Sequence, residues 1–188
     1  QKSFLELEES LFLEFKASFQ SSYPHAPQKH SDDKGQTFYT IGGKQRFRSE
    51  KEIQRLLQDM VLEAIVGFLN ASGGKLVIGV HEKDNIKNIV GIGYERFSSE
   101  DEYERHVIQH IINRIGMPFM GDYITTGFEE IDGRKLFIID IKAFVPRNGQ
   151  IPALLDGVSC FRRTGPRTDM ILPGADFAKF VADRMRRK

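Results

Sequence analysis

Cysteine, tryptophan and long apolar runs are scarce or missing in this sequence of 188 residues. The single cysteine, Cys160, excludes an intramolecular disulfide framework and a cysteine-based zinc site. No apolar run approaches the roughly 18 residues that a membrane-spanning helix needs. The segment from Gln1 to Glu9 is acidic and lacks the apolar core of a signal peptide. These absences predict an intracellular, cytoplasmic protein with no membrane partner.

A strong excess of charge of one sign is also missing. The chain has 27 Lys and Arg against 26 Asp and Glu, a formal net charge of +1. This balance excludes a histone-like protein that coats nucleic acid by charge alone. The cations are nevertheless clustered, and two clusters stand out: Lys44, Arg46 and Arg48, and then Arg162, Arg163 and Arg167. A local basic groove is one interpretation, and scattered solvated charge is the other.

The composition is that of a globular domain. Hydrophobic residues make up 40% and charged residues 28% of the sequence, which suits one core under a solvated surface. We expect a single domain over 1–188. A polar stretch at about 20–36 is expected to be a flexible loop or insertion, and a basic C-terminal helix is expected at about 175–188.

Two amphipathic helices are the strongest local signals. Ser49 followed by Glu52 is typical of a helix start, and apolar residues then recur with helical spacing as far as Leu69. A second such helix is expected from about Ser99 to Ile115. His106 and His110 lie four residues apart on it, but the glutamate of a zinc-protease motif is missing between them, so we predict no zinc site there.

The remaining apolar segments are short and read as strands. Single strands are expected over 11–16, 37–41, 45–48, 75–80 and 89–92, with a hairpin turn at Gly42 and Gly43. Hairpins are expected over 123–143, turning at Asp132, and over 153–163, turning at Asp156. This pattern predicts an α+β fold, with mixed or antiparallel sheets built from hairpins and packed with the two helices.

Four landmarks occur in order along the chain. They are ESLFLEFK at 9–16, IVGFLNASGGKLVIGV at 65–80, IVGI at 89–92, and finally IP at 151–152 with CFRRTG at 160–165. Together they make the chain resemble the Schlafen-type AlbA-like family over about 3–168. The resemblance implies a Schlafen core fold and a role in binding nucleic acid, with RNA favoured over DNA. It also makes a homodimer an expectation.

The same resemblance implies a set of acidic residues. Nucleolytic members use two glutamates of the first motif and an acid after the GV strand, and Glu9 and Glu14 match the first two. Where relatives often show Asp, this chain has His81, so Glu82 is the first choice for the third acid and Asp84 the second. Glu9, Glu14 and Glu82 are thus the candidate catalytic residues and ligands of Mg²⁺ or Mn²⁺.

The spacing of the first two acids sets a geometric condition. Five residues separate Glu9 from Glu14, so on one continuous strand they would lie on opposite faces. The chain must therefore bend near Glu9 to bring them together. Lys16 shares a strand face with Glu14 and is a candidate phosphate contact. In the alternative interpretation, Glu9 caps a helix or pairs with a cation, and Glu14 pairs with Lys16 or with an arginine.

Basic residues supply the candidate nucleic-acid contacts, which are Lys16, Lys44, Arg46, Arg48, Arg162, Arg163 and Arg167. Arg162 and Arg163 point to opposite faces of an extended strand, so one of them is expected to be structural. Three functions stay open. They are a metal-dependent endoribonuclease acting on structured RNA such as tRNA, a non-catalytic DNA-binding or transcriptional-regulatory module, and a protein-interaction module of a larger protein.

Overall fold

The computed structural model describes residues 8–43, 45–84, 86–147 and 150–186. Lys44, one of the candidate nucleic-acid contacts, therefore lies outside the described residues. The strands are β1 (Leu13–Lys16), β2 (Gln28–Ser31), β3 (Thr37–Ile41), β4 (Gln45–Phe47), β5 (Gly74–Ile78), β6 (Val80–Lys83), β7 (Ile86–Ile89), β8 (Ile124–Ile131), β9 (Arg134–Ile141), β10 (Cys160–Thr164) and β11 (Arg167–Ile171). The helices are α1 (Glu50–Leu69), α2 (Glu100–Arg114) and α3 (Ala175–Arg186), with short 3-10 turns η2 (Gly93–Glu95) and η3 (Met117–Phe119).

The main sheet has four strands in the order β1-β5-β9-β8. β1 runs parallel to β5, and the other two pairings are antiparallel. The hairpin of β8 and β9 turns where expected, because Asp132 and Gly133 adopt the positive φ angles that a tight turn requires. This mixed sheet, together with the helices, confirms the α+β fold class.

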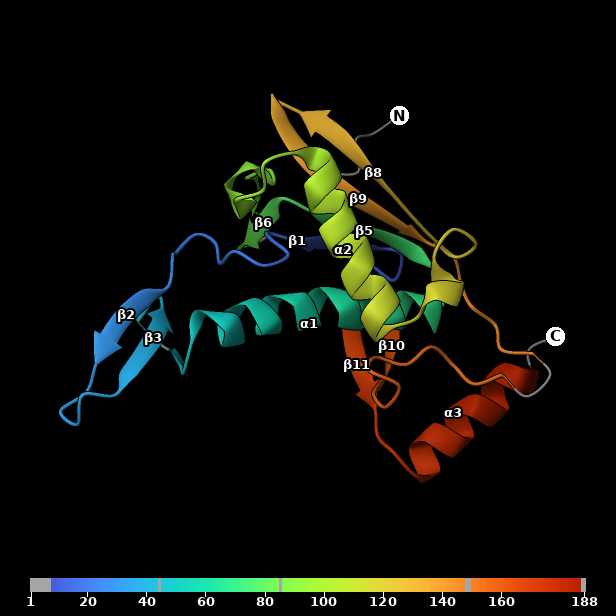
Figure 1. The fold of residues 1–188 in the computed structure, drawn as a ribbon. Helices are drawn as coiled ribbons and strands as arrows, with labels where there is room; N and C mark the ends of the chain where they lie inside the picture. Colours follow the sequence, from blue (N-terminus) through green and yellow to red (C-terminus); the bar gives the residue numbers. More distant parts are fainter. Residues whose placement is uncertain (1–7, 44, 85, 148–149, 187–188) are drawn as a thin grey trace.

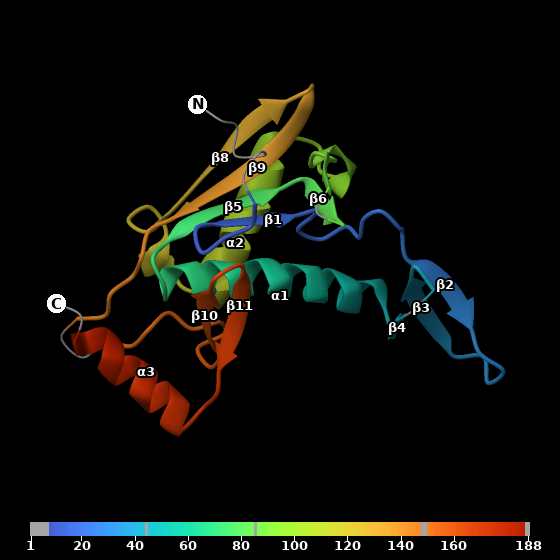
Figure 2. The same cartoon turned by 180° about the vertical axis from the view of Figure 1, so that it is seen from behind.

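Helix α1 organises the body of the molecule. It begins as expected, since the Ser49 side chain accepts a hydrogen bond of 3.2 Å from the Glu52 N–H, while Glu52 accepts one from the Arg48 N–H. The helix lies between the main sheet and the β10–β11 hairpin, and α2 crosses beside it (Figures 1 and 2). Its second half is buried on nearly all sides, from Val61 to Leu69, because it is covered by both layers.

The two faces of the main sheet contribute to different apolar clusters. Leu76, Ile78 and Phe137 point toward the helices and join the larger core. Phe15, Val77 and Leu136 alternate with them and join a smaller cluster on the other face. This period of two is what half-buried strands require. Beside this sheet, β6 and β7 form a separate hairpin, and Asp84 at its turn has a φ of 54°.

The segment at about 20–36, expected to be a flexible loop or insertion, contains the strand β2, so it is not a loop throughout. β2 pairs with β3, and β3 pairs with β4, in a three-stranded sheet that projects from the body beyond the N-terminal end of α1 (Figure 1). Asp32 closes the β2–β3 turn, because its Oδ1 accepts hydrogen bonds from the N–H groups of Lys34 and Gln36. We call residues 20–49 the arm.

A second correction concerns the C-terminal hairpin. The segments expected to pair, 153–155 and 158–163, share only an isolated bridge between Leu155 and Ser159. β10 pairs with β11 instead, and the chain turns at Gly165, whose φ is +61°. Asp156, at the expected turn, is held by Arg114 and Arg55. The final helix, α3, forms as expected over Ala175–Arg186.

In the described part of the chain, no helix combines the length and the hydropathy that crossing a membrane would require.

Candidate functional site

A pocket of about 410 Å³ opens at the C-terminal end of β1, where β6 begins. Several of the residues singled out in the sequence meet in it. The lining residues are Glu9, Phe15, Lys16, Ala17, Val80, His81, Glu82 and Asp84. The chain turns back on itself between Ser10 and Leu13, where the Ser10 N–H donates to the Leu13 carbonyl at 2.9 Å. The chain therefore bends close to Glu9, where a bend was expected, but the bend does not bring Glu14 into the pocket lining.

Glu9 is held by the backbone of β1. Its Oε1 accepts a hydrogen bond of 2.9 Å from the Phe15 N–H. β1 is an edge strand of the main sheet, so N–H groups on its outer side have no neighbouring strand to pair with. The carboxylate of Glu9 takes the place of that missing partner at the rim of the pocket.

Glu14 does not line the pocket. Its side chain is buried and forms ion pairs with Lys16 and with Arg163. Arg163 is 1% exposed, and its Nη2 also donates to the carbonyls of Ser10 at 2.8 Å and Leu13 at 3.0 Å. This arrangement is the alternative interpretation of Glu14: a carboxylate paired with a lysine and an arginine inside the fold.

Electrostatics at this cluster follow from its burial. Burial lowers the pKa of Lys16, and the negative charges of Glu9 and Glu63 act against that shift. Burial likewise lowers the pKa of Arg163, again opposed by Glu9. The negative charge of Glu9, at the rim of the pocket, therefore favours the charged forms of Lys16 and Arg163. The same side chain also accepts the hydrogen bond from β1.

The predicted three-carboxylate metal site does not fit this arrangement. Glu9 and Glu82 share the pocket, but the carboxylate of Glu14 is committed to two cations on the interior side. Glu82 Oε2 is buried and lacks a hydrogen-bond partner among the described residues. Within residues 8–43, 45–84, 86–147 and 150–186, no group of three or more His, Cys, Asp or Glu side chains is arranged to hold a metal ion.

The candidate basic residues separate into two that pair with Glu14 and two surface sets. Lys16 is half-buried at the pocket, where it pairs with Glu14. Arg163 is buried in the interior, so it is a structural residue and not a surface phosphate contact. Arg162 and Arg167 are exposed on the β10–β11 hairpin, where Asp169 lies opposite Arg162 and 3.9 Å from Arg167. The negative charge of Asp169 thus offsets part of the positive charge of Arg162 and Arg167.

The second surface set, Arg46 and Arg48, is exposed on the arm. Arg46 places its guanidinium carbon 3.6 Å from the centre of the Phe38 ring. His30 stacks on Phe38 as well, with ring centres 5.1 Å apart and an interplanar angle of 20°. Neither ring was a candidate nucleic-acid contact in the sequence, and His30 falls in the segment expected to be a flexible loop or insertion. β2 consists of polar residues only, so the sequence carried no hydropathy signal for this pairing.

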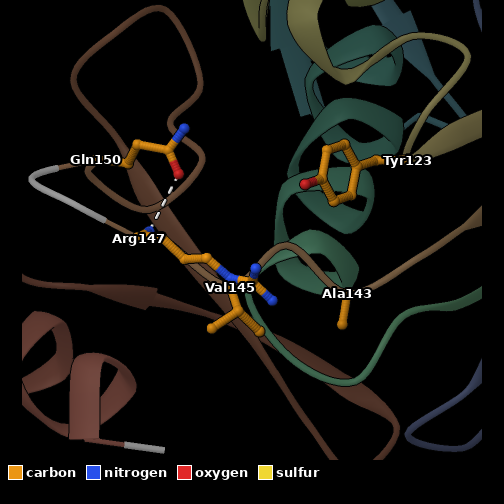
Figure 3. A pocket seen from close by; sticks show the side chains of 5 residues that line it. All are labelled: Tyr123, Ala143, Val145, Arg147 and Gln150. Atoms are coloured by element: carbon orange, nitrogen blue, oxygen red, sulfur yellow. Dashed lines mark hydrogen bonds between the residues drawn. The ribbon is translucent and has the colours of Figure 1, made fainter. Parts of the chain in front are cut away.

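A larger hollow lies at the opposite end of the main sheet. It measures about 530 Å³ and is lined by Tyr123, Ala143, Val145, Arg147 and Gln150 (Figure 3). On one side of it, the Gln150 side chain accepts a hydrogen bond of 3.0 Å from the Arg147 N–H. Its described lining residues include no acidic side chain that could act together with a base, and none of them was a candidate site residue in the sequence.

Comparison with known proteins places most of the chain in one family. Residues 9–170 match the Schlafen, AlbA_2 family. No curated protein matches the chain.

Two solved structures align with parts of this chain. The DIP2311 protein from Corynebacterium diphtheriae aligns with 14% identity and a TM-score of 0.49, over 85% of this chain and 24% of that one, so this chain spans about a quarter of its length. The N-terminal domain of a RecG-related protein from Nitrosomonas europaea, whose name classes it with ATP-dependent DNA helicases, aligns with 17% identity and a TM-score of 0.35, over 50% of this chain and 68% of that one. At such scores, neither similarity transfers a function to this chain.

Proposed function

Since this chain belongs to the Schlafen, AlbA_2 family, we propose that it is a nucleic-acid-binding domain whose contact surface is the arm. One observation carries the proposal. Residues 20–49 hold five Lys and Arg against two Asp, a formal charge of +3, although the whole chain carries only +1. The polyanionic backbone of nucleic acid is attracted to such a local excess of cations.

The placement of the cations supports this role. Lys29, Arg46 and Arg48 are exposed. Lys29 and Arg46 lie on the sheet that extends away from the body, and Arg48 follows directly after β4 (Figure 2). Among the described residues, none of these three side chains takes part in an ion pair. Guanidinium groups are suited to bidentate contacts with phosphate. These cations are therefore available to a ligand, in contrast to Lys16 and Arg163.

Binding, and not cleavage, is what the geometry supports best. The pocket beside β1 presents Glu9, Glu82 and Asp84 against Lys16, a balance that repels phosphate. Because Glu14 is paired inside the fold, the described residues do not present the three-carboxylate set of Glu9, Glu14 and Glu82 that a metal-dependent endoribonuclease of this type would use. RNA remains the favoured ligand, on the family resemblance.

Titration of labelled RNA and DNA at low salt tests the proposal. The triple variant Lys29→Gln, Arg46→Gln, Arg48→Gln is expected to bind at least about tenfold more weakly, because it removes three of the positive charges of the arm. The matched control Arg105→Gln, Lys142→Gln, Arg147→Gln removes the same charge from exposed positions on the body and is expected to stay within about twofold of the unmodified chain.

The competing results are distinct. Flat titrations of the unmodified chain with both RNA and DNA would overturn the proposal, and an equal weakening in both triple variants would move the contact surface away from the arm. Parallel incubations with Mn²⁺ and with EDTA are expected to give the same affinity and intact RNA. Metal-dependent cleavage that disappears in Glu14→Ala would instead restore the endoribonuclease hypothesis.

A further inference from the structure

One face of the arm carries a row of flat side chains. In the register of the small sheet, His30 lies opposite Phe38, and Thr40 lies opposite Arg46. Side chains on directly opposed residues share a face, as do residues two apart on a strand. His30, Phe38 and Arg46 therefore stand together on one face, contributed by β2, β3 and β4 in turn.

Contacts across this row are close. Phe38 is in contact with the guanidinium of Arg46 on the neighbouring strand and with the imidazole of His30 on the other. The His30 ring is fixed in addition by a hydrogen bond of 2.9 Å between its Nε2 and Thr40 Oγ1. The result is a set of planar groups that is already ordered before any ligand arrives, which lowers the entropic cost of binding.

The two faces of the small sheet have different environments. On the other face, Phe47 is buried and lies opposite Tyr39 in the register, at the end of the arm where α1 begins. On the face with the planar row, Arg46 is exposed, and His30 and Phe38 are half-buried. Arg46 is therefore open at the surface, and His30 and Phe38 are partly accessible beside it, in the part of the molecule that carries the excess positive charge.

From these observations we propose that the arm recognises single-stranded nucleic acid, by stacking an unpaired base on the row formed by His30, Phe38 and Arg46. This inference rests on the proposed nucleic-acid binding and specifies the class of ligand. Bases stack on aromatic rings and on arginine planes irrespective of sequence. In a duplex the bases are already stacked on each other, so only an unpaired base has a free ring to offer.

The positive charges next to the row would attract the phosphates on either side of the stacked base. Arg46 is both a member of the row and a cation, and Arg48 follows it two residues later at the start of α1. A strand that crosses the row would pass its backbone over these two guanidinium groups. The combination of stacking and a basic track is the arrangement by which proteins hold single strands without reading their sequence.

A purely structural role for the row is the competing explanation, since cross-strand pairs of flat side chains also stabilise small sheets. The two explanations differ in what Phe38→Leu does to different ligands. Loss of stacking weakens binding of a single strand and leaves duplex binding, which depends on phosphate contacts, unchanged. Loss of the sheet would weaken both.

The experiment compares a single-stranded RNA and a duplex of equal length, with DNA of the same sequences as a further arm, by fluorescence anisotropy. Phe38→Leu is expected to weaken single-strand binding about tenfold and to leave duplex binding within about twofold of the unmodified chain. Phe38→Tyr, which keeps the ring, is expected to bind as the unmodified chain does. Lys29→Gln, a charge change on the opposite face, is expected to weaken both ligands equally.

A second measurement covers the case in which Phe38→Leu unfolds the arm, as revealed by loss of amide protection in β2 and β3. A single strand that carries 2-aminopurine is then bound to the unmodified chain, and quenching of its fluorescence is the expected sign of stacking. Absence of quenching, or an equal weakening for single strand and duplex in a folded Phe38→Leu, overturns the stacking proposal. Absence of any binding by the unmodified chain overturns the proposed function itself.

Discussion

Two neighbouring arginines have opposite environments, and the difference decides what each can do. Arg162 is exposed and lies 5.9 Å from the centre of the Phe180 ring, whereas Arg163 is buried against Glu14 and two backbone carbonyls. Arg163→Met should lower the free energy of unfolding by about 3 kcal/mol, because it leaves a buried carboxylate short of a partner. Urea denaturation measures this change.

The neighbouring residue supplies the control for that prediction. Arg162→Met should change the free energy of unfolding by less than about 0.5 kcal/mol, as expected for an exposed position. Similar destabilisation in the two variants would show that the ion pair with Glu14 contributes little to stability.

His106 and His110 give the fold a dependence on pH. Their rings lie 4.7 Å apart, and burial lowers the pKa of both below the usual 6.5, with the charge of Glu102 opposing the shift at His106. The unfolded chain therefore takes up protons below about pH 6.5 that the folded chain does not, so stability falls as the pH falls through that range.

The double variant His106→Gln, His110→Gln should show a smaller decrease in melting temperature between about pH 7 and about pH 5. The raised pKa of the buried Glu95 is common to both proteins and cancels in the comparison. Parallel curves for the two proteins would contradict the assignment.

For these residues the sequence predicted alternatives, and the structure distinguishes between them. Alternation along an extended strand predicts that one of Arg162 and Arg163 is structural, but it does not say which one. The pairing of Glu14 with Lys16 follows from a spacing of two residues. The ion pair of Glu14 with Arg163 joins positions far apart in the chain. It depends on how β1 and β10 are placed around α1, and no local sequence pattern encodes that placement.

The end of α1 shows how one side chain joins separate elements. Asn70 is fully buried, and its Nδ2 donates to the carbonyls of Ala153 at 2.8 Å and Phe161 at 2.9 Å, while its Oδ1 accepts from the Ala153 N–H at 2.9 Å. Asn70→Leu leaves these buried backbone groups without partners and should cost about 3 kcal/mol of unfolding free energy. Thermal or urea denaturation provides the measurement.

Asn113, which is exposed on α2, is the matched position for that substitution. Asn113→Leu should remain within about 0.5 kcal/mol of the unmodified protein. An equally small change in the free energy of unfolding for Asn70→Leu would show that the hydrogen bonds of Asn70 do not hold the segment before β10 against α1.

Elements with a clear apolar period were predictable, and polar ones were not. The spacing of apolar residues predicted α1 and α2, and the Asp132–Gly133 turn predicted the β8–β9 hairpin. β2 consists of Gln28, Lys29, His30 and Ser31, so it has no apolar face to signal a strand. Its pairing with β3 depends on the turn at Asp32 and on the contact between His30 and Phe38. A hydropathy pattern predicts neither of these interactions.

The whole molecule divides into a layered body and a projecting arm that differ in charge. The body has α1 between the main sheet and the β10–β11 hairpin, and the excess of positive charge resides in the arm (Figure 1). Net charge alone, at +1, does not reveal this separation. The basic cluster at Arg46 and Arg48 was visible in the sequence, but its position on a separate sheet became apparent only in three dimensions.

The most direct test of this division is the salt dependence of single-stranded RNA binding. The affinity of the unmodified chain and of the double variant Arg46→Gln, Arg48→Gln is measured over a series of salt concentrations. If both arginines bind phosphates, the slope of log affinity against log salt should be shallower in the variant by about 1.4, because each phosphate neutralised on a single strand contributes about 0.7 to the slope. Equal slopes for the two proteins would contradict the assignment of the arm as the nucleic-acid-binding surface.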